Sequence, residues 1–367
     1  MKRVRVFDYL RQYKDIEDKI LSGINTVLNS GSLILGEQVK RFEDNFSNYL
    51  GSDGYSVAVN SGTDALVIAL RALNIGYGDE VITVSNTAVP TVSAIRIVGA
   101  TPVFCDVDES TALIRIDYIT SLITENTKAI IPVHLFGNVV DIDEIKKVIA
   151  EREVYIIEDC AQALGSKFND SMVGILGDIS AFSFYPTKNL GAYGDAGLCF
   201  SKDPVIAEKM RAIRMYGFNE KNISEIEGIN SRMDEIQAAI LNVKLEYIDS
   251  YIEKRRELAK EYNKLLNPGI VRFSEYAHSR HSYHLFVIRV LDRDIVRKKL
   301  SDVGIDTGIH YQCPIHLMSG YKFLGYSEES LPITELLSGE LLSLPMYPEL
   351  TKEDVAFVCE KLNYIMS

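Results

Sequence analysis

Short apolar runs alternate with amphipathic stretches along most of the chain. The apolar runs predict strands at Ser56–Val59, Glu80–Val84, Pro102–Cys105, Ala129–Val133, Val154–Ile157, Ile179–Phe184 and Ala196–Phe200. Between the first of them, apolar residues recur at helical spacing and predict helices at Asp64–Leu73 and Ala88–Val98. Buried strands that alternate with helices are typical of a mostly parallel α/β sheet.

The pattern changes at both ends of the chain. Two amphipathic helices, Asp15–Leu28 and Glu37–Leu50, are expected before the first strand. A charged stretch with apolar residues at helical spacing, Leu241–Leu266, predicts one long helix that links two domains. The strands and helices expected after it are His284–Val290, Asp294–Val303, Leu341–Leu344 and Thr351–Ile365. We therefore expect N-terminal helices and a large domain in residues 1–245, and a small α+β domain in residues 246–367.

Composition and charge limit the classes of partner and the cellular location that can be expected for this chain. The chain has 367 residues, of which 47% are hydrophobic and 25% charged, as in ordinary globular proteins. Its net charge of −12 argues against non-specific nucleic-acid binding. No apolar run approaches the length of a membrane-spanning helix, so no membrane partner is expected. Five widely spaced cysteines without a CxxC pair indicate a reducing compartment, and the cytoplasm is the expected location.

Two segments carry candidate chemistry. The strand Val154–Ile157 leads into Glu158-Asp159, and open α/β sheets bind ligands beyond the carboxyl ends of their strands. The strand that ends at Phe184 leads into a loop with one lysine, Lys188, among apolar and aromatic neighbours. Desolvation lowers the pKa of a lysine and makes its amine a nucleophile. Taken singly, a helix cap and a surface lysine are the simpler interpretations.

Together, the two segments fit pyridoxal 5'-phosphate. This cofactor needs a lysine for a Schiff base, a carboxylate at its pyridine nitrogen and a cradle for its phosphate. Asp159 supplies the carboxylate, and Ser61-Gly62-Thr63, which follows a strand and opens a helix, supplies free N–H groups. Ser183 adds a hydroxyl, and Gln162 reaches the phenolic oxygen.

Several motifs, in their order and spacing, resemble the DegT/DnrJ/EryC1/StrS family of sugar aminotransferases over nearly the whole chain. They are Asn60–Leu66, Gly78–Ile82, Gly99–Pro102, Pro132–Gly137, Glu158–Gly165, Ser183–Gly191 and Gly228–Ala239. The resemblance implies the aspartate-aminotransferase (type I) fold, an α/β fold with a large, mostly parallel sheet and a small α+β C-terminal domain.

The resemblance also implies roles for single residues. Lys188 is the catalytic residue, which forms the Schiff base and shuttles the proton. Asp159 pairs with the pyridine nitrogen and Gln162 contacts the ring oxygen. The phosphate is held by Gly62, Thr63 and Ser183, and by Asn230 of the other subunit, which implies a homodimer with the active site at the interface.

For two features, the residues of this chain can be compared with what the resemblance implies. Without the resemblance, Asn230 is interpreted as a turn residue after Gly228. Many family members stack an aromatic residue on the cofactor ring, and in the segment Ser85–Thr91 this chain has Ala88 at that place. The stacking partner therefore stays undetermined.

The substrate follows from the resemblance. The segments Ser183–Gly197 and Gly308–Leu317 are similar to enzymes that aminate C3 of dTDP-3-keto-6-deoxyhexoses, with L-glutamate as donor. The candidate substrate residues are Tyr185, Lys221, His310, Tyr311 and His316. Lys221 and Tyr311 suit a diphosphate, whereas each histidine is equally well a structural residue.

Other functions stay open. The enzyme could act on a UDP-linked 4-keto or 3-keto sugar, or the chain could be a non-catalytic regulator of the same fold, which Lys188, Asp159 and Gln162 argue against. A pyridoxal phosphate desulfurase or lyase is disfavoured, because it needs a mobile nucleophilic cysteine and Cys160 lies at a buried strand end.

No metal site is expected. The histidines nearest to one another, His278, His281 and His284, do not share one face of an extended strand, since His281 and His284 fall on opposite faces. His134, after a buried strand, is expected to be structural or to support residues of the site without touching the ligand.

Overall fold

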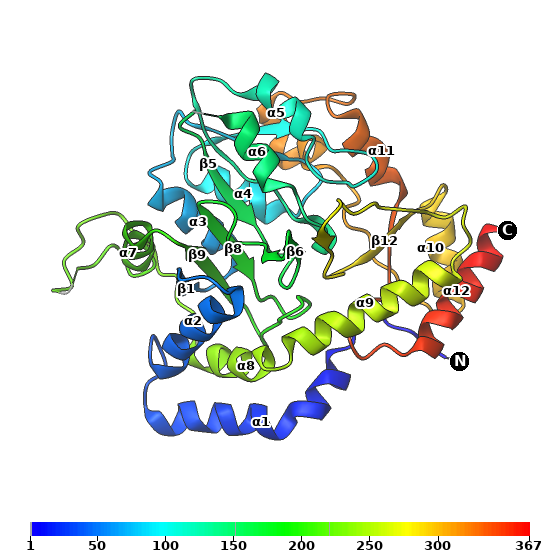
Figure 1. The fold of residues 1–367 in the computed structure, drawn as a ribbon, viewed down its shortest axis with the longest axis horizontal. Helices are drawn as coiled ribbons and strands as arrows, with labels where there is room; N and C mark the ends of the chain where they lie inside the picture. The colour runs from blue at the N-terminus through cyan, green and yellow to red at the C-terminus, as the bar shows by residue number, and fades with distance from the viewer. Residues whose placement is uncertain (1, 151, 220) are drawn as a thin grey trace.

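The computed structural model describes residues 2–150, 152–219 and 221–367. Its larger part is built on a seven-stranded sheet in the order β1-β9-β8-β5-β4-β2-β3 (Figure 1). The strands are β1 (Tyr55–Val59), β2 (Glu80–Val84), β3 (Thr101–Cys105), β4 (Thr127–Ile130), β5 (Tyr155–Asp159), β8 (Ile179–Ser183) and β9 (Gly197–Ser201). Only β9 runs against its two neighbours, so the predicted mostly parallel sheet is confirmed.

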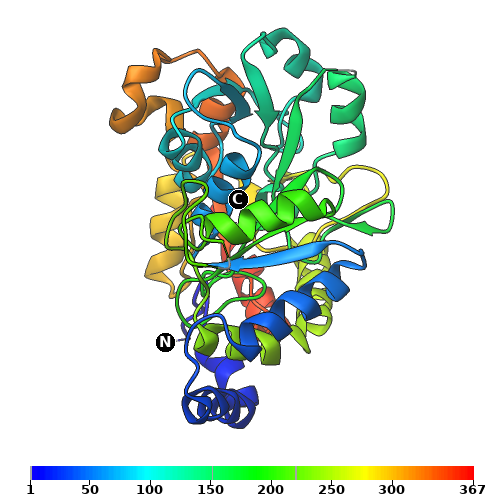
Figure 2. The ribbon, with the colours of Figure 1, turned by 90° about the vertical axis from the view of Figure 1, so that its left-hand side faces the viewer.

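Helices cover both faces of this sheet because the strands are apolar on both faces. Val57 and Val59 of β1 pack on one side with α3 and α7, whereas Ala58 between them packs on the other side with α2. Figure 2 shows β1 between α7 and α2. The helices of this part are α2 (Glu37–Leu50), α3 (Gly62–Ala72), α4 (Val89–Ile97), α5 (Ile116–Leu122), α6 (Ile142–Ile149), α7 (Pro204–Ile213) and α8 (Glu235–Leu245).

The C-terminal part has its own small sheet, in the order β10-β12-β13, and its own apolar core. Its elements are α9 (Ile248–Leu265), β10 (Val271–Arg272), β12 (Phe286–Arg289), α10 (Arg293–Asp302), α11 (Pro332–Glu340), β13 (Leu341–Leu344) and α12 (Lys352–Met366). Two short 3-10 helices, η2 (Ile315–Leu317) and η3 (Ser319–Leu324), precede α11. A third sheet, β11-β6-β7, joins Ser279–Arg280 to Lys167–Phe168 and Ser171–Met172.

The beginning of the described chain packs with the C-terminal part. Val4 forms a bridge with Ile305 and belongs to the C-terminal core. The following helix, α1 (Tyr9–Ser30), crosses to the large part and packs on α8 (Figure 1). The predicted boundary after residue 245 stays a prediction.

The single long helix predicted at Leu241–Leu266 is wrong. α8 ends at Leu245 and α9 begins at Ile248. The reason is that the two helices serve different cores: Leu241 packs with the large sheet, and Leu258 and Tyr262 pack with the small one. The charge pattern is continuous between α8 and α9, so the sequence gave no sign that one helix ends and another begins there. No helix in the described ranges is long and apolar enough to cross a membrane.

Candidate active site

The first turn of α3 forms a cradle at the carboxyl edge of the large sheet. Ser61 caps the helix, since its side chain accepts a hydrogen bond from the Asp64 N–H across 3.1 Å. The N–H groups of Gly62 and Thr63 come before the intrahelical hydrogen bonds and have no acceptor within the helix. Such a turn binds anions such as phosphate.

Two glycines let other segments approach this turn. A Cβ atom on Gly62 would lie 2.7 Å from the Cβ of Ser183, which ends β8. A Cβ atom on Gly197 would lie 2.3 Å from the carbonyl carbon of Ser61. Only glycine permits either approach, and the predicted phosphate residues Gly62, Thr63 and Ser183 therefore come together.

Asp159 lies at the end of β5 and is 4% exposed. Its Oδ2 accepts a hydrogen bond from Thr91 Oγ1 across 2.8 Å, and its Oδ1 accepts one from the Ala161 N–H across 3.1 Å. Burial raises the pKa of Asp159; these hydrogen bonds and the charge of Lys188 counteract the rise in part. A cationic partner, such as a protonated pyridine nitrogen, would stabilise the carboxylate further.

Lys188 lies in the loop after β8, in a turn where its N–H donates to the Tyr185 carbonyl across 2.8 Å. Burial lowers the pKa of the Lys188 amine to about 8, against the opposing effect of Asp159. Burial, and then the positive charge of Lys188, lowers the pKa of His284, and that of His310 to about 4. The amine is thus within electrostatic reach of Asp159, His284 and His310, and is far more often unprotonated than an exposed lysine.

Gln162 joins the predicted cofactor site to the predicted substrate site. Its Oε1 accepts from the Phe136 N–H across 2.8 Å, and its Nε2 donates to the Tyr311 hydroxyl across 2.8 Å. Burial, and then the charge of Asp159, raises the pKa of the Tyr311 hydroxyl, which therefore keeps its proton. That proton is free for a ligand, because Gln162 uses the oxygen as an acceptor.

The two candidate substrate histidines differ. The Nδ1 of His310 is 2.8 Å from Ser343 Oγ, and its ring is partly exposed beside Tyr311. His316 is fully buried, and both ring nitrogens have partners: Ser85 Oγ at 2.8 Å and Glu335 Oε1 at 3.1 Å. The geometry therefore favours His310 over His316 for direct contact with a substrate.

Three other candidates have exposed side chains. Tyr185 is 53% exposed. Lys221 and Asn230 are exposed in the long connection after α7, which projects from the body of the molecule (Figure 1). The neighbour of Asn230, Ser231, donates to Asp64 Oδ2 across 2.7 Å and so ties this connection to the first turn of α3.

Sequence reasoning missed several residues that build the site. Thr91 contacts Asp159, Ser343 contacts His310, and the charge of Lys188 lowers the pKa of His284. Lys244, which is 3% exposed, donates to the Gly191 carbonyl across 2.5 Å and holds the loop after Lys188. Thr91 lies at the end of the segment Ser85–Thr91, in which many family members place the stacking aromatic residue, and its hydroxyl was a usable signal; the other contacts join distant segments.

Among the described residues, one buried group has the composition of a metal site, namely His134, Glu158 and Cys160. His134 Nδ1 accepts from the Val140 N–H across 3.0 Å, and His134 Nε2 is 3.0 Å from Glu158. Glu158 also accepts from the N–H groups of Gly174, Leu176 and Gly177. His134 and Glu158 therefore already have partners within the chain, which fits the expected structural or supporting role of His134.

The comparisons with known proteins agree with this geometry. The sequence profile of the DegT/DnrJ/EryC1/StrS aminotransferase family matches residues 14–363. The dTDP-3-amino-3,4,6-trideoxy-alpha-D-glucose transaminase of Micromonospora megalomicea subsp. nigra is 42% identical over 99% of this chain and 98% of that protein. A protein of Geobacillus stearothermophilus named pleiotropic regulatory protein is 40% identical over 98% of this chain and 97% of its own length. The crystal structure of S. venezuelae DesV in complex with a ketimine intermediate superposes with a TM-score of 0.97 and 38% identity, covering 100% of this chain and 99% of that one.

Proposed function

Because the chain belongs to the DegT/DnrJ/EryC1/StrS aminotransferase family, we propose that it transfers an amino group from L-glutamate to a nucleotide-linked keto-6-deoxy sugar. The first candidate acceptor is a dTDP-3-keto-6-deoxyhexose, in line with the Micromonospora transaminase. The observation that carries the proposal is the Lys188 amine, whose pKa burial lowers to about 8 within reach of the Asp159 carboxylate.

The residues fit pyridoxal 5'-phosphate, because Gly62 and Gly197 let β8, β9 and the first turn of α3 approach closely, which brings the free N–H groups of that turn near Ser183. Gly62, Thr63 and Ser183 would hold the phosphate, and Asp159 would hold the proton on the pyridine nitrogen. When bound, the cofactor supplies an electron sink for the reacting carbon of the substrate. Lys188 Nζ would hold the cofactor, and its free amine would take the proton from the donor's α-carbon.

The substrate would lie against Tyr311 and His310. Tyr311 offers a hydroxyl proton, held in place by Gln162 across 2.8 Å. His310 has one ring nitrogen on Ser343 and leaves the other for a sugar or phosphate oxygen. Both groups are uncharged at neutral pH, since burial lowers the pKa of His310 to about 4 and raises that of Tyr311.

The active enzyme is a homodimer in this proposal, and Lys221 and Asn230 complete the site of the partner subunit. The support is their exposure in the projecting connection after α7. A cationic Lys221 suits the diphosphate of a nucleotide sugar. We place the enzyme in the cytoplasm because all five cysteines are free thiols.

The test is the absorption spectrum of the purified protein with pyridoxal 5'-phosphate, before and after addition of L-glutamate. We expect a lysine-bound cofactor band that glutamate converts to the amine form, and no such band in Lys188→Ala. Lys202→Ala, which removes an exposed lysine, is the matched control and keeps the band.

The acceptor is identified by which sugar nucleotide restores the first band. Restoration by a dTDP-3-keto-6-deoxyhexose supports the proposal, and restoration only by a UDP-linked 4-keto or 3-keto sugar replaces the acceptor. A protein that shows no band at all contradicts the aminotransferase function. That outcome favours a regulatory role, as in the name of the Geobacillus relative.

A further inference from the structure

The connection between β2 and α4, residues Ser85–Ala88, borders the Lys188 site. Ser85, Asn86 and Thr87 are each at most 3% exposed. Thr87 Oγ1 lies 3.2 Å from Thr91 Oγ1, which in turn donates to Asp159. Two side-chain contacts therefore connect this segment to Asp159, so a shift of the segment would also move the groups that hold Asp159.

His316 holds the start of this connection. Its Nδ1 is 2.8 Å from Ser85 Oγ, and its backbone N–H donates to the same oxygen across 3.0 Å. The N–H of Ile315 donates to the Ser85 carbonyl across 3.2 Å. Ser85 is thus fixed at three points by two consecutive residues of η2.

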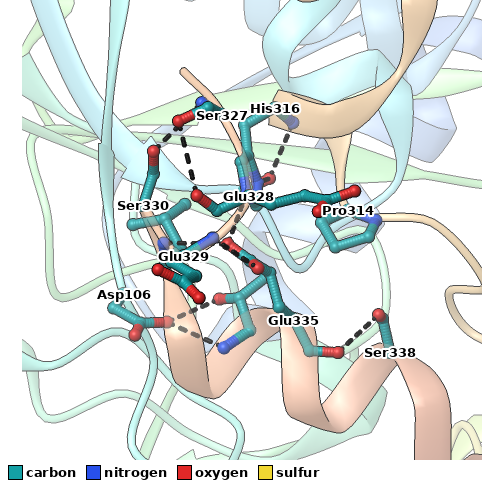
Figure 3. Close-up of polar contacts among 12 residues, drawn as sticks. Asp106, Pro314, His316, Ser327, Glu328, Glu329, Ser330, Glu335 and Ser338 are labelled. Atoms are coloured by element: carbon teal, nitrogen blue, oxygen red, sulfur yellow. Dashed lines mark hydrogen bonds and ion pairs between the residues drawn. The ribbon is translucent and has the colours of Figure 1, made fainter.

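Glu335 of α11 holds the other side of the imidazole. Its Oε1 is 3.1 Å from His316 Nε2, and it also accepts from the N–H groups of Leu331 and Glu329 (Figure 3). Burial alone would raise the pKa of Glu335, but the two backbone N–H groups and then His316 outweigh it and keep the carboxyl ionised.

The ionised carboxylate of Glu335 accepts a hydrogen from His316, and this affects which atoms donate in the contacts from Glu335 through His316 to Ser85. In the tautomer that carries its hydrogen on Nε2, the ring donates to Glu335 and accepts at Nδ1. The Ser85 hydroxyl then donates to Nδ1 and accepts from the His316 N–H. Every donor has one acceptor, and no ring nitrogen is left for a substrate.

Asn86, the residue after Ser85, indicates why this connection is held in place. Asn86 is 3% exposed, and its Nδ2 has no partner among the described residues. A buried amide without an acceptor is costly unless a bound group supplies one. Ala88, two residues further, offers no ring to stack on a cofactor. The fit of a cofactor at this place therefore depends more on the position of the backbone of the β2–α4 connection.

We propose that His316 is a positioning residue, which through Ser85 fixes the β2–α4 connection against the bound cofactor, and that Glu335 orients His316. This role replaces the substrate contact expected from the sequence. It rests on the proposed function, since it needs pyridoxal 5'-phosphate at Lys188.

The test is the affinity of the apoprotein for pyridoxal 5'-phosphate, measured by absorbance titration, together with KM for the sugar nucleotide. We expect His316→Ala to weaken cofactor affinity about tenfold, the factor that corresponds to one lost buried hydrogen bond, without a change in KM. His316→Asn, which keeps an acceptor at the Nδ1 position, should restore most of the affinity. His316→Gln, which reaches only Glu335, should not.

His281→Ala is the matched control, because His281 is also buried and accepts from the Tyr283 N–H across 2.8 Å, away from this connection. It should lower the melting temperature and leave cofactor affinity unchanged. Ser85→Ala and Glu335→Gln test the same contacts if His316→Ala does not fold, and each should weaken cofactor affinity. A raised KM with unchanged cofactor affinity, or no change in either, overturns the inference; a wild type without affinity for the cofactor contradicts the proposed function instead.

Discussion

Thr91→Val removes the hydroxyl that donates to Asp159 Oδ2 across 2.8 Å and keeps the branched shape of the side chain. A hydrogen bond to a charged group contributes about 1.5–3 kcal/mol, and a shift of one pKa unit corresponds to about 1.36 kcal/mol. The substitution should therefore raise the pKa of Asp159 by about one to two units. The direction is upward because Thr91 stabilises the ionised form, against a burial that already raises this pKa.

The assay is the rate at which L-glutamate converts the lysine-bound cofactor, followed by absorbance as a function of pH. Asp159 holds the proton of the pyridine nitrogen only while it is ionised, so the rate falls as pH drops through its pKa. In Thr91→Val this fall should begin about one to two pH units higher, and the rate at alkaline pH should approach that of the wild type.

Two controls make the result decisive. Thr91→Ser keeps the hydroxyl and should keep the wild-type pH profile. Thr83→Val removes another buried threonine hydroxyl, which donates to the Ile131 carbonyl across 2.9 Å, and should lower stability without moving the profile. If Thr91→Val has the wild-type acidic limb, the hydrogen bond does not tune Asp159 and the reasoning is refuted.

Three further predictions concern the amine, the cradle and the dimer. The apoprotein should capture pyridoxal 5'-phosphate faster as pH rises and level off above about 8, because only the free amine of Lys188 reacts and its pKa is about 8 rather than 10.5; a stopped-flow midpoint near 10.5 contradicts this. Gly197→Ala, whose Cβ would lie 2.3 Å from Ser61, should weaken phosphate and cofactor binding in an equilibrium titration, whereas Gly320→Ala, which meets nothing within 4 Å, should not. Mixing inactive Lys188→Ala and Asn230→Ala chains should restore part of the glutamate half-reaction, since one site of each mixed dimer is intact; no recovery after verified exchange of subunits excludes the shared site.

Much of the fold could be predicted because its signals are local. The strands of the large sheet are short apolar runs, and all of those predicted are present, although β4 is shorter than expected. α7 was missed although Asp203 caps it and Pro204 occupies its first turn, a signal that the sequence does contain. The break between α8 and α9 had no such signal, because it depends on two cores that only the folded chain defines.

The residues of the candidate site also fall into two groups, those with a local signal in the sequence and those whose contacts depend on the folded chain. Lys188, Asp159 and Gly62 stand in motifs whose chemistry is visible in the sequence. The contact of Gln162 with Tyr311 joins residues 149 positions apart, and that of Ser85 with His316 joins residues 231 apart. No local pattern encodes such distances, so the engagement of both His316 nitrogens within the chain emerged only from the packing of η2 on the end of β2.

The pairing of β1 with β9 has a consequence for the synthesis of the protein. Val59 pairs with Gly197, so the strand that leads into the phosphate cradle waits for a partner made much later by the ribosome. At roughly 5 to 20 residues per second, many seconds pass in which β1 has no partner strand, and the cluster around Val57, Val59 and α3 lacks the residues of β9 and α7. Nascent chains are therefore most exposed to aggregation during this interval, and a product terminated before β9 has no complete cradle.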